Sequence, residues 1–144
     1  MPLTDRKHTI GLAYASGTAD RTGAALDMSG WQEVDIIVSV AGVATGATYS
    51  IKAQTDAASA FSSPQDIEGT AQTIADDDDG QGFIIHVANP PERYVRVYVD
   101  KDTSNACGES VMYVQHKPDK KPVTNDTTDA ITTESHVWPA NGTA

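Results

Sequence analysis

A run of four carboxylates, Asp76 to Asp79, is followed by Gly80 and is the densest group of potential metal ligands in the chain. Clustered carboxylates can bind Ca²⁺, which takes six to eight oxygen ligands. Calcium loops, however, place their ligands at alternate positions and close with a distant Glu, a spacing that this run lacks. Adjacent like charges ending in glycine are typical of a solvated turn. We therefore expect a turn, with calcium binding as the alternative, and assign no metal site.

Side chains able to act as nucleophiles or acid–base catalysts are few and isolated. The one cysteine, Cys107, lies between small residues and is interpreted as a packed side chain rather than a nucleophile. The four histidines are distant from one another in sequence: His8, His86, His116 and His136. His86 lies within an apolar run, which favours a core-edge position over a ligand role. No Gly-x-Ser-x-Gly, His-Glu-x-x-His or phosphate-loop motif occurs. We expect no enzyme activity and no cofactor.

Composition limits the classes of partner. The 144 residues are enough for one domain with its own core, and the formal net charge is −10. Such an acidic surface disfavours nucleic acid and anionic membranes, because phosphate contacts need clustered Lys and Arg. No apolar run is long enough to span a membrane, and the first residues lack the order of a secretory signal. We therefore expect neither a nucleic-acid partner nor a membrane partner.

The clearest strand signal lies between Phe83 and Val99. Runs rich in β-branched and aromatic residues flank residues 89–92, where Pro90 and Pro91 cannot donate backbone hydrogen bonds. After this turn three valines alternate with larger polar or aromatic residues: Val95, Val97 and Val99 against Tyr94, Arg96 and Tyr98. The alternation predicts an antiparallel strand pair at the centre of an all-β domain. The valines would face the core, and the Tyr and Arg side chains would face solvent or a partner.

Further strands are predicted over residues 8–15, 32–43, 48–55, 65–74 and 109–117. Phe61, in the loop after residue 56, is expected to plug the core, while Asp20, Arg21 and Lys101 are interpreted as loop charges. No window keeps a helical period. About eight short strands separated by Gly, Pro and Asp predict an all-β jelly-roll or β-sandwich fold with antiparallel strands.

The composition changes at Pro118. Residues 1–117 are predicted to form the β domain, with residues 1–7 as a loose arm, and residues 118–144 an extended polar tail. The tail carries Val137 and Trp138, and a tryptophan is a typical interface anchor. Three alternatives remain open: the tail packs on its own domain, docks on a neighbouring subunit or stays disordered.

Four segments together resemble a known group of proteins. They are Ala-Ala-Leu-Asp-Met-Ser-Gly-Trp (24–31), Thr-Ile-Ala-Asp-Asp-Asp (73–78), Pro-Glu-Arg-Tyr-Val-Arg (91–96) and His-Val-Trp-Pro-Ala (136–140). In this order, with the last segment at the end of a Thr- and Asp-rich tail, they look like small virion proteins encoded among the head genes of tailed bacteriophages, the capsid decoration or cement proteins. The resemblance covers residues 23–144, and its motifs are structural rather than catalytic.

This resemblance implies a function in binding. Proteins of this kind sit on the outer capsid surface, often as homotrimers, and bridge neighbouring major capsid subunits. The chain would then be made in the host bacterial cytoplasm and end in the virion, with the major capsid protein as its partner. The interface candidates are Tyr94, Arg96 and Tyr98 on one face, and Val137 with Trp138 in the tail.

Two other functions remain as alternatives. A carbohydrate- or receptor-binding jelly roll would need a surface aromatic platform, for which Trp31 with Tyr14 or Tyr49 are the candidates. A head–tail connector or tail component would assemble into rings. Neither alternative requires catalysis.

Overall fold

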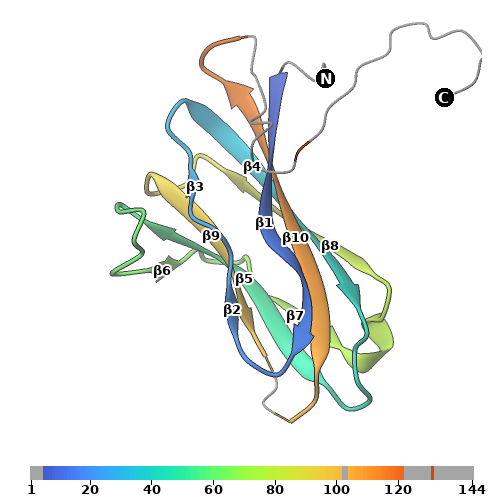
Figure 1. Ribbon diagram of the computed structural model, residues 1–144. Coiled ribbons are helices and arrows are strands. Elements are labelled where there is room, and N and C mark those ends of the chain that lie inside the picture. Colours follow the sequence, from blue (N-terminus) through green and yellow to red (C-terminus); the bar gives the residue numbers. More distant parts are fainter. Residues whose placement is uncertain (1–4, 102–103, 122–130, 132–144) are drawn as a thin grey trace, which may run out of the picture.

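The computed structural model describes residues 5–101, 104–121 and 131, and the strands of this part form two antiparallel sheets (Figure 1). The four-stranded sheet has the order β1-β10-β4-β8, made of Arg6–Gly17, Cys107–Pro118, Trp31–Ala41 and Gly82–Ala88. The six-stranded sheet has the order β2-β9-β5-β6, made of Arg21–Thr22, Tyr94–Asp100, Thr48–Asp56 and Gln65–Asp66. In the same sheet β3 (Leu26–Asp27) pairs with β9, and β7 (Gln72–Ala75) pairs with β5. The predicted all-β antiparallel sandwich is confirmed.

The core lies between the two sheets and follows the alternation of the sequence. On β4 and β9 the inward residues are fully or almost fully buried: Val34, Ile36, Val38, Val40, Val95, Val97 and Val99. Ile51 and Ala53 of β5 and Val111 of β10 join the same cluster. Because side chains at alternate positions share one face of a strand, each strand supplies a stripe to the core and leaves its other face outside.

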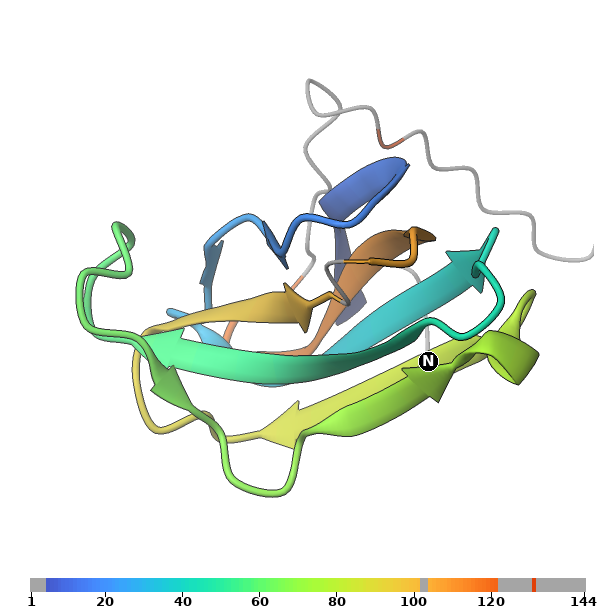
Figure 2. The ribbon, with the colours of Figure 1, turned by 90° about the horizontal axis from the view of Figure 1, so that it is seen from below.

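The predicted pairing of the strands around residues 89–92 is wrong. Both strands exist, as β8 and β9, but β8 pairs with β4 and β9 pairs with β5, so they belong to different sheets. The chain crosses between the sheets after β8 (Figure 2). At this crossing the Asn89 amide donates to the Gln32 carbonyl (2.7 Å), and the φ of Asn89 is 48°. Alternation shows which face of a strand is buried, and strands of opposite layers bury their faces against the same core as readily as hairpin partners do.

Other boundaries differ in smaller ways. The strand expected over residues 65–74 is two short strands, β6 and β7, because the chain turns at Gly69 with a φ of 77°. β1 begins at Arg6, within the expected loose arm, and its register with β10 is interrupted twice between Ile10 and Ala15. Such irregularities twist an edge strand and hinder the addition of a further strand.

Tyr113 of β10 connects the two sheets. Its side chain is fully buried, and its hydroxyl oxygen accepts a hydrogen bond from the Val97 amide of β9 (3.0 Å). Burial raises the pKa of this hydroxyl above its ordinary value. Two glycines leave room for it: a Cβ on Gly11 would lie 2.7 Å from the ring, and one on Gly23 would lie 2.1 Å from the hydroxyl oxygen.

The carboxyl-terminal part of the described chain stays attached to the sandwich. Pro118 pairs with Trp31, the Asp119 amide donates to the Gly30 carbonyl (2.9 Å), and Lys121 pairs with Asp5 (2.7 Å). Among the residues that follow, only Ile131 is described, and its side chain is buried. Within the described residues, no helix has the length and apolar character needed to cross a membrane.

Candidate functional site

The predicted interface residues Tyr94, Arg96 and Tyr98 lie together on the outer face of the six-stranded sheet. All three are half-exposed side chains of β9, and their cross-strand partners on β5 are Asp56, Gln54 and Lys52. We call the outward side chains of β9 and β5, with Phe61 and Asp66 beside them, the Tyr/Arg face. Tyrosine and arginine are enriched among the residues that dominate protein–protein binding energy.

Arg96 is fixed in the centre of the Tyr/Arg face. Its Nε and one Nη donate to Gln54 Oε1 at 3.0 and 2.9 Å, and its guanidinium lies 4.3 Å from the centre of the Phe61 ring. Gln54 in turn donates to Asp66 Oδ1 (2.9 Å). Because these contacts already restrict the side chain, little further rotamer entropy would be lost on binding.

Tyr98 is held at the edge of the same face. Its hydroxyl donates to Asp20 Oδ2 (2.9 Å), while Asp20 Oδ1 accepts from the Lys101 amide (2.8 Å). The Lys101 amide and then the Tyr98 hydroxyl lower the pKa of Asp20, so its carboxylate stays charged well into acidic solution. On the other side, Lys52 Nζ lies 5.3 Å from the centre of the Tyr98 ring and pairs with Asp66 (2.7 Å).

A shallow groove begins at Arg93, the neighbour of Tyr94. Arg93 lies 5.2 Å from the centre of the Tyr94 ring and donates to both oxygens of Asp27, at 3.0 and 2.7 Å. The groove has a volume of about 450 Å³ and is lined by Met28, Trp31, Asn89, Glu92, Arg93 and Asp119, among others. It is the place where the crossing between β8 and β9 meets the start of β4.

Phe61 does not plug the core as expected. Its side chain is buried under the guanidinium of Arg96, on the outer side of the six-stranded sheet. The loop places it there with a φ of 49°, and its amide donates to the Ala58 carbonyl (3.1 Å). An aromatic ring between small residues indicates burial, and the sequence alone does not say on which side of a sheet.

Three of the carboxylates of residues 76–79 accept hydrogen bonds from backbone amides. Asp76 to Asp78 form a single 3₁₀ turn, as the predicted turn requires. Asp76 accepts from the Gly46 amide, Asp79 from the Gly42 amide (both 2.7 Å) and Asp78 from the Ala75 amide (2.9 Å). The bonds of Asp76 and Asp79 hold the loop between β4 and β5, and the bond of Asp78 closes its own turn. Within the described residues, no group of three or more His, Cys, Asp or Glu side chains is placed to hold a metal ion.

His86 is on the surface, which corrects the expected core-edge position. Its side chain is about half-exposed on the outer face of the four-stranded sheet, and its Nδ1 lies 2.6 Å from Asp35 Oδ1. His116 Nε2 lies 2.6 Å from the other oxygen of Asp35. Partial burial raises the pKa of Asp35, but the hydrogen bonds from the two imidazoles outweigh it, and the net shift is downward.

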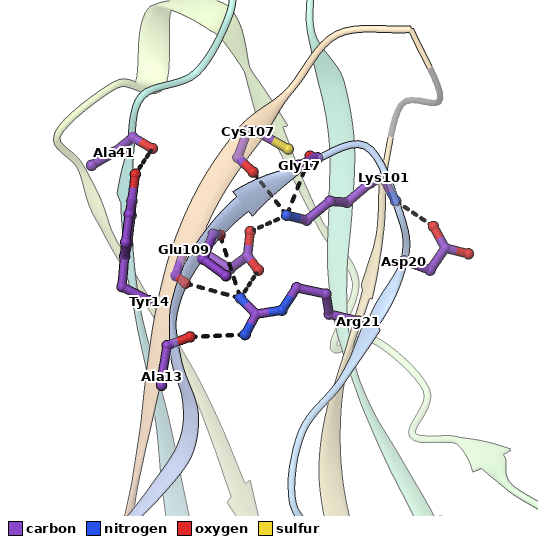
Figure 3. Close-up of polar contacts among 10 residues, drawn as sticks. Ala13, Tyr14, Gly17, Asp20, Arg21, Ala41, Lys101, Cys107 and Glu109 are labelled. Atoms are coloured by element: carbon purple, nitrogen blue, oxygen red, sulfur yellow. Dashed lines mark hydrogen bonds and ion pairs between the residues drawn. The ribbon is translucent and has the colours of Figure 1, made fainter.

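A buried charged cluster connects the two sheets at the end of the sandwich (Figure 3). The side chains of Lys101 and Glu109 are fully buried and pair at 2.8 Å, and Lys101 Nζ also donates to the Cys107 carbonyl (2.8 Å). Arg21 donates to the other oxygen of Glu109 (2.6 Å) and to the Ala13 carbonyl (2.8 Å). Both oxygens of Glu109 are thus engaged by cations, which is the condition for burying a carboxylate. The cluster is structural.

Sequence reasoning missed this cluster, although a signal for it exists. Lys101 and Arg21 were expected to be loop charges, but Lys101 is buried and Arg21 lies in β2. Glu109 shares the inward parity of Val111 and Tyr113 on β10. A carboxylate at an inward position requires a buried cation beside it. The alternation on β10 therefore indicates that a Lys or Arg side chain lies buried next to Glu109. Cys107 is buried in the core, consistent with a packed side chain.

The remaining candidates do not gather into one site. Tyr49 is buried. Trp31 lies at the start of β4, whereas the Tyr14 hydroxyl lies 3.5 Å from the Ala41 carbonyl oxygen at the end of β4. At the rise of a strand, the two ends of β4 are roughly 30 Å apart. Trp31, Tyr14 and Tyr49 therefore form no common aromatic platform. Val137, Trp138 and His136 lie outside the described residues.

Comparison with known proteins adds no relative from which a function can be transferred. The chain matches no protein-family model, and no curated protein matches it.

Proposed function

We propose that the protein is a virion structural protein that binds the outer surface of a phage capsid and stabilises contacts between major capsid subunits. In this proposal the protein acts by binding alone, without catalysis or a cofactor. The resemblance of four sequence segments to capsid decoration proteins suggests the partner. The observation that carries the proposal is the Tyr/Arg face, a set of binding-type side chains already held in place.

Preorganisation supports a binding role for this face. Arg96 is fixed by Gln54 and Phe61, and Tyr98 by Asp20 and Lys52. A partner that contacts them loses little entropy in ordering them, and aromatic rings supply apolar area at low entropic cost. Many copies on a lattice would add the effect of simultaneous contacts, so each single contact can be weak.

The charge around the Tyr/Arg face indicates what the partner offers. Asp20, Asp27, Asp56 and Asp66 surround the three residues, and the hydrogen bonds they accept lower the pKa of each. They therefore stay ionised at neutral pH. Asp27 and Asp66 are paired with Arg93 and Lys52. A capsid surface that fits this rim would place a Lys or Arg side chain opposite Asp20, which is exposed, and such a charge speeds and directs encounter more than it adds affinity.

The direct test is co-sedimentation with heads of the phage whose genome encodes the chain. The wild-type protein is expected to pellet with the heads, and the double variant Tyr94→Ala, Tyr98→Ala to remain largely in the supernatant. Both side chains are half-exposed, so the fold should persist, which a thermal melt verifies.

A matched control is Thr73→Ala, an exposed position on β7 of the same sheet. It is expected to pellet like wild type. If the wild-type protein stayed in the supernatant, or if the double variant pelleted as well as wild type, the proposal would be wrong.

The groove beside Tyr94 favours a second candidate, a carbohydrate-binding module. It combines the half-buried ring of Trp31 with the polar groups of Asn89, Glu92 and Arg93 in about 450 Å³. Sugar sites in proteins commonly join an apolar surface to a few polar groups. Binding to a glycan array that is abolished by Trp31→Ala and unaffected by Tyr98→Ala would favour this candidate over the capsid.

A further inference from the structure

A row of apolar side chains crosses the outer face of the four-stranded sheet. Among the described residues, all the large apolar side chains that are exposed belong to this sheet: Ile10, Tyr14, Ile37 and Ile84. The register places Ile10 beside Met112, Met112 beside Ile37 and Ile37 beside Ile84, so the row runs across all four strands. Exposed apolar groups that form a continuous patch mark an interaction surface, whereas scattered ones do not.

This face carries both a projecting apolar side chain and an apolar hollow. Ile84, on the edge strand β8, is 60% exposed and projects from the sheet. Beside it, an apolar hollow of about 500 Å³ extends over β1, β10 and β4 and is lined by Ile10, Tyr14, Met112 and Ile37, among others. The row thus has a projecting side chain on β8 and a hollow over the other three strands.

The charge of this face differs from that of the rest of the protein. Its carboxylates, Glu33 and Asp35, are paired with Lys117 and with His86 and His116, and Arg6 lies at one corner. Two basic side chains, Lys117 and Arg6, therefore balance two carboxylates, although the chain carries a net charge of −10. Copies of such an acidic chain repel one another over most of their surface. A neutral apolar face is where two of them can approach.

We infer that the outer face of the four-stranded sheet packs against the same face of a second copy of this chain. A twofold axis parallel to the strands would place β8 of one copy over β1 of the other. Ile84 of each copy would then enter the hollow of its partner. A contact of this kind is self-complementary and closes as a dimer.

The size of the face is sufficient for a weak but specific dimer. The contact area of this face follows from its dimensions. With four strands about 4.8 Å apart and four rows of side chains about 6.8 Å apart, it is roughly 500 Å² per copy. Two copies would bury roughly 1,000 Å², which is the lower limit for a specific interface. The resemblance to decoration proteins implies a homotrimer instead, so the mass in solution separates the twofold assembly from the threefold one.

The test is the mass of the full chain in solution, measured by light scattering or sedimentation over a wide concentration range. The mass of the wild-type protein is expected to rise with concentration from that of one chain, 15.2 kDa, toward twice that value. Ile84→Lys, at a mainly exposed position, should give single chains, and Ala13→Trp, which fills the hollow, should do the same. Thr73→Lys adds the same charge to an exposed strand position of the other sheet and should leave the doubled mass unchanged.

Three results would overturn the inference. A wild-type protein that remains a single chain would leave this face to a different protein or to the carboxyl-terminal residues of the chain. A mass of three chains would show an assembly that a twofold contact cannot produce. A doubled mass that survives both Ile84→Lys and Ala13→Trp would place the contact elsewhere. Because no capsid is needed, any of these results leaves the proposed capsid binding untouched.

Discussion

At the scale of single residues, the most consequential feature is a buried cluster of charged side chains. Glu109 and Lys101 have no exposed side-chain surface, and Arg21 completes their cluster. Removing one member leaves the others as uncompensated charges in a medium that solvates them poorly. The cluster therefore makes the fold depend strongly on three particular side chains.

Glu109→Gln tests this dependence. The substitution keeps the shape of the side chain but leaves Lys101 and Arg21 without their counter-charge. The free energy of unfolding should fall by about 3–5 kcal/mol, measured by urea denaturation. The control is Glu33→Gln, which removes the partner of Lys117 at the surface and should cost less than about 1 kcal/mol. Equal losses for the two variants would contradict the structural role of the cluster.

Asp56 is expected to make stability depend on pH. Its carboxylate accepts from the amides of Ala58 (2.9 Å) and Ser63 (2.8 Å), and these bonds lower its pKa in the folded state. The stabilisation is therefore complete above the ordinary carboxyl pKa of about 3.9. It is lost as the pH falls through the lower folded value.

The measurement is the urea midpoint of wild type and Asp56→Asn at a series of pH values. Wild type should be the more stable protein at neutral pH, and the difference should shrink in acid as the wild-type carboxylate is protonated. A difference that stays constant down to the acid limit would show that the ionised carboxylate contributes nothing.

At the scale of elements, the sequence predicts the strands better than their partners. The inward stripes of β4, β9 and β10 follow from alternation, because burial of one face is a local property of a strand. The assignment of β8 and β9 to different sheets depends on which distant strand each one pairs with. No local pattern contains that information, so the predicted pair was wrong although both strands were right.

In the candidate site, too, the local pattern is predicted and the long-range contacts are not. Alternation placed Tyr94, Arg96 and Tyr98 on one outward face, and the structure has them there. The side chains that hold them come from elsewhere in the chain: Asp20, Lys52, Gln54, Phe61 and Asp66. Such contacts arise only when β2, β5 and β6 come together, which single-strand patterns do not describe.

Gly23→Ala tests how closely the elements approach at the centre of the sandwich. The new Cβ would lie 2.1 Å from the Tyr113 hydroxyl oxygen and 2.7 Å from a methyl group of Val97. Displacing these buried groups should cost about 1–3 kcal/mol, seen as a lower urea midpoint. The matched control is Gly17→Ala, where a Cβ meets nothing within 4 Å, and it should be nearly neutral. Two equally stable variants would mean that the Tyr113 contact is looser than described.

At the scale of the whole molecule, the two outer faces have different characters. The Tyr/Arg face is polar, preorganised and surrounded by carboxylates, whereas the outer face of the four-stranded sheet is neutral and carries the apolar row. A sandwich presents such faces on opposite sides. One protein can therefore bind a capsid with one face and a copy of itself with the other.

Salt should affect the two contacts differently. Capsid binding through the carboxylate rim should weaken severalfold as ionic strength rises, because exposed charges are screened. Self-association through the apolar row should not weaken, because salt also screens the repulsion between two acidic chains. Co-sedimentation and light scattering in the same salt series make the comparison, and a salt-independent capsid contact would argue against a charged rim at that interface.

The most direct measurement of the central claim is a cryo-electron microscopy reconstruction of phage heads incubated with the wild-type protein. We expect density for the sandwich on the outer lattice, with β9 and β5 toward the major capsid protein and Tyr94, Arg96 and Tyr98 within the contact. Bare heads, or bound protein with the Tyr/Arg face turned toward solvent, would contradict the account.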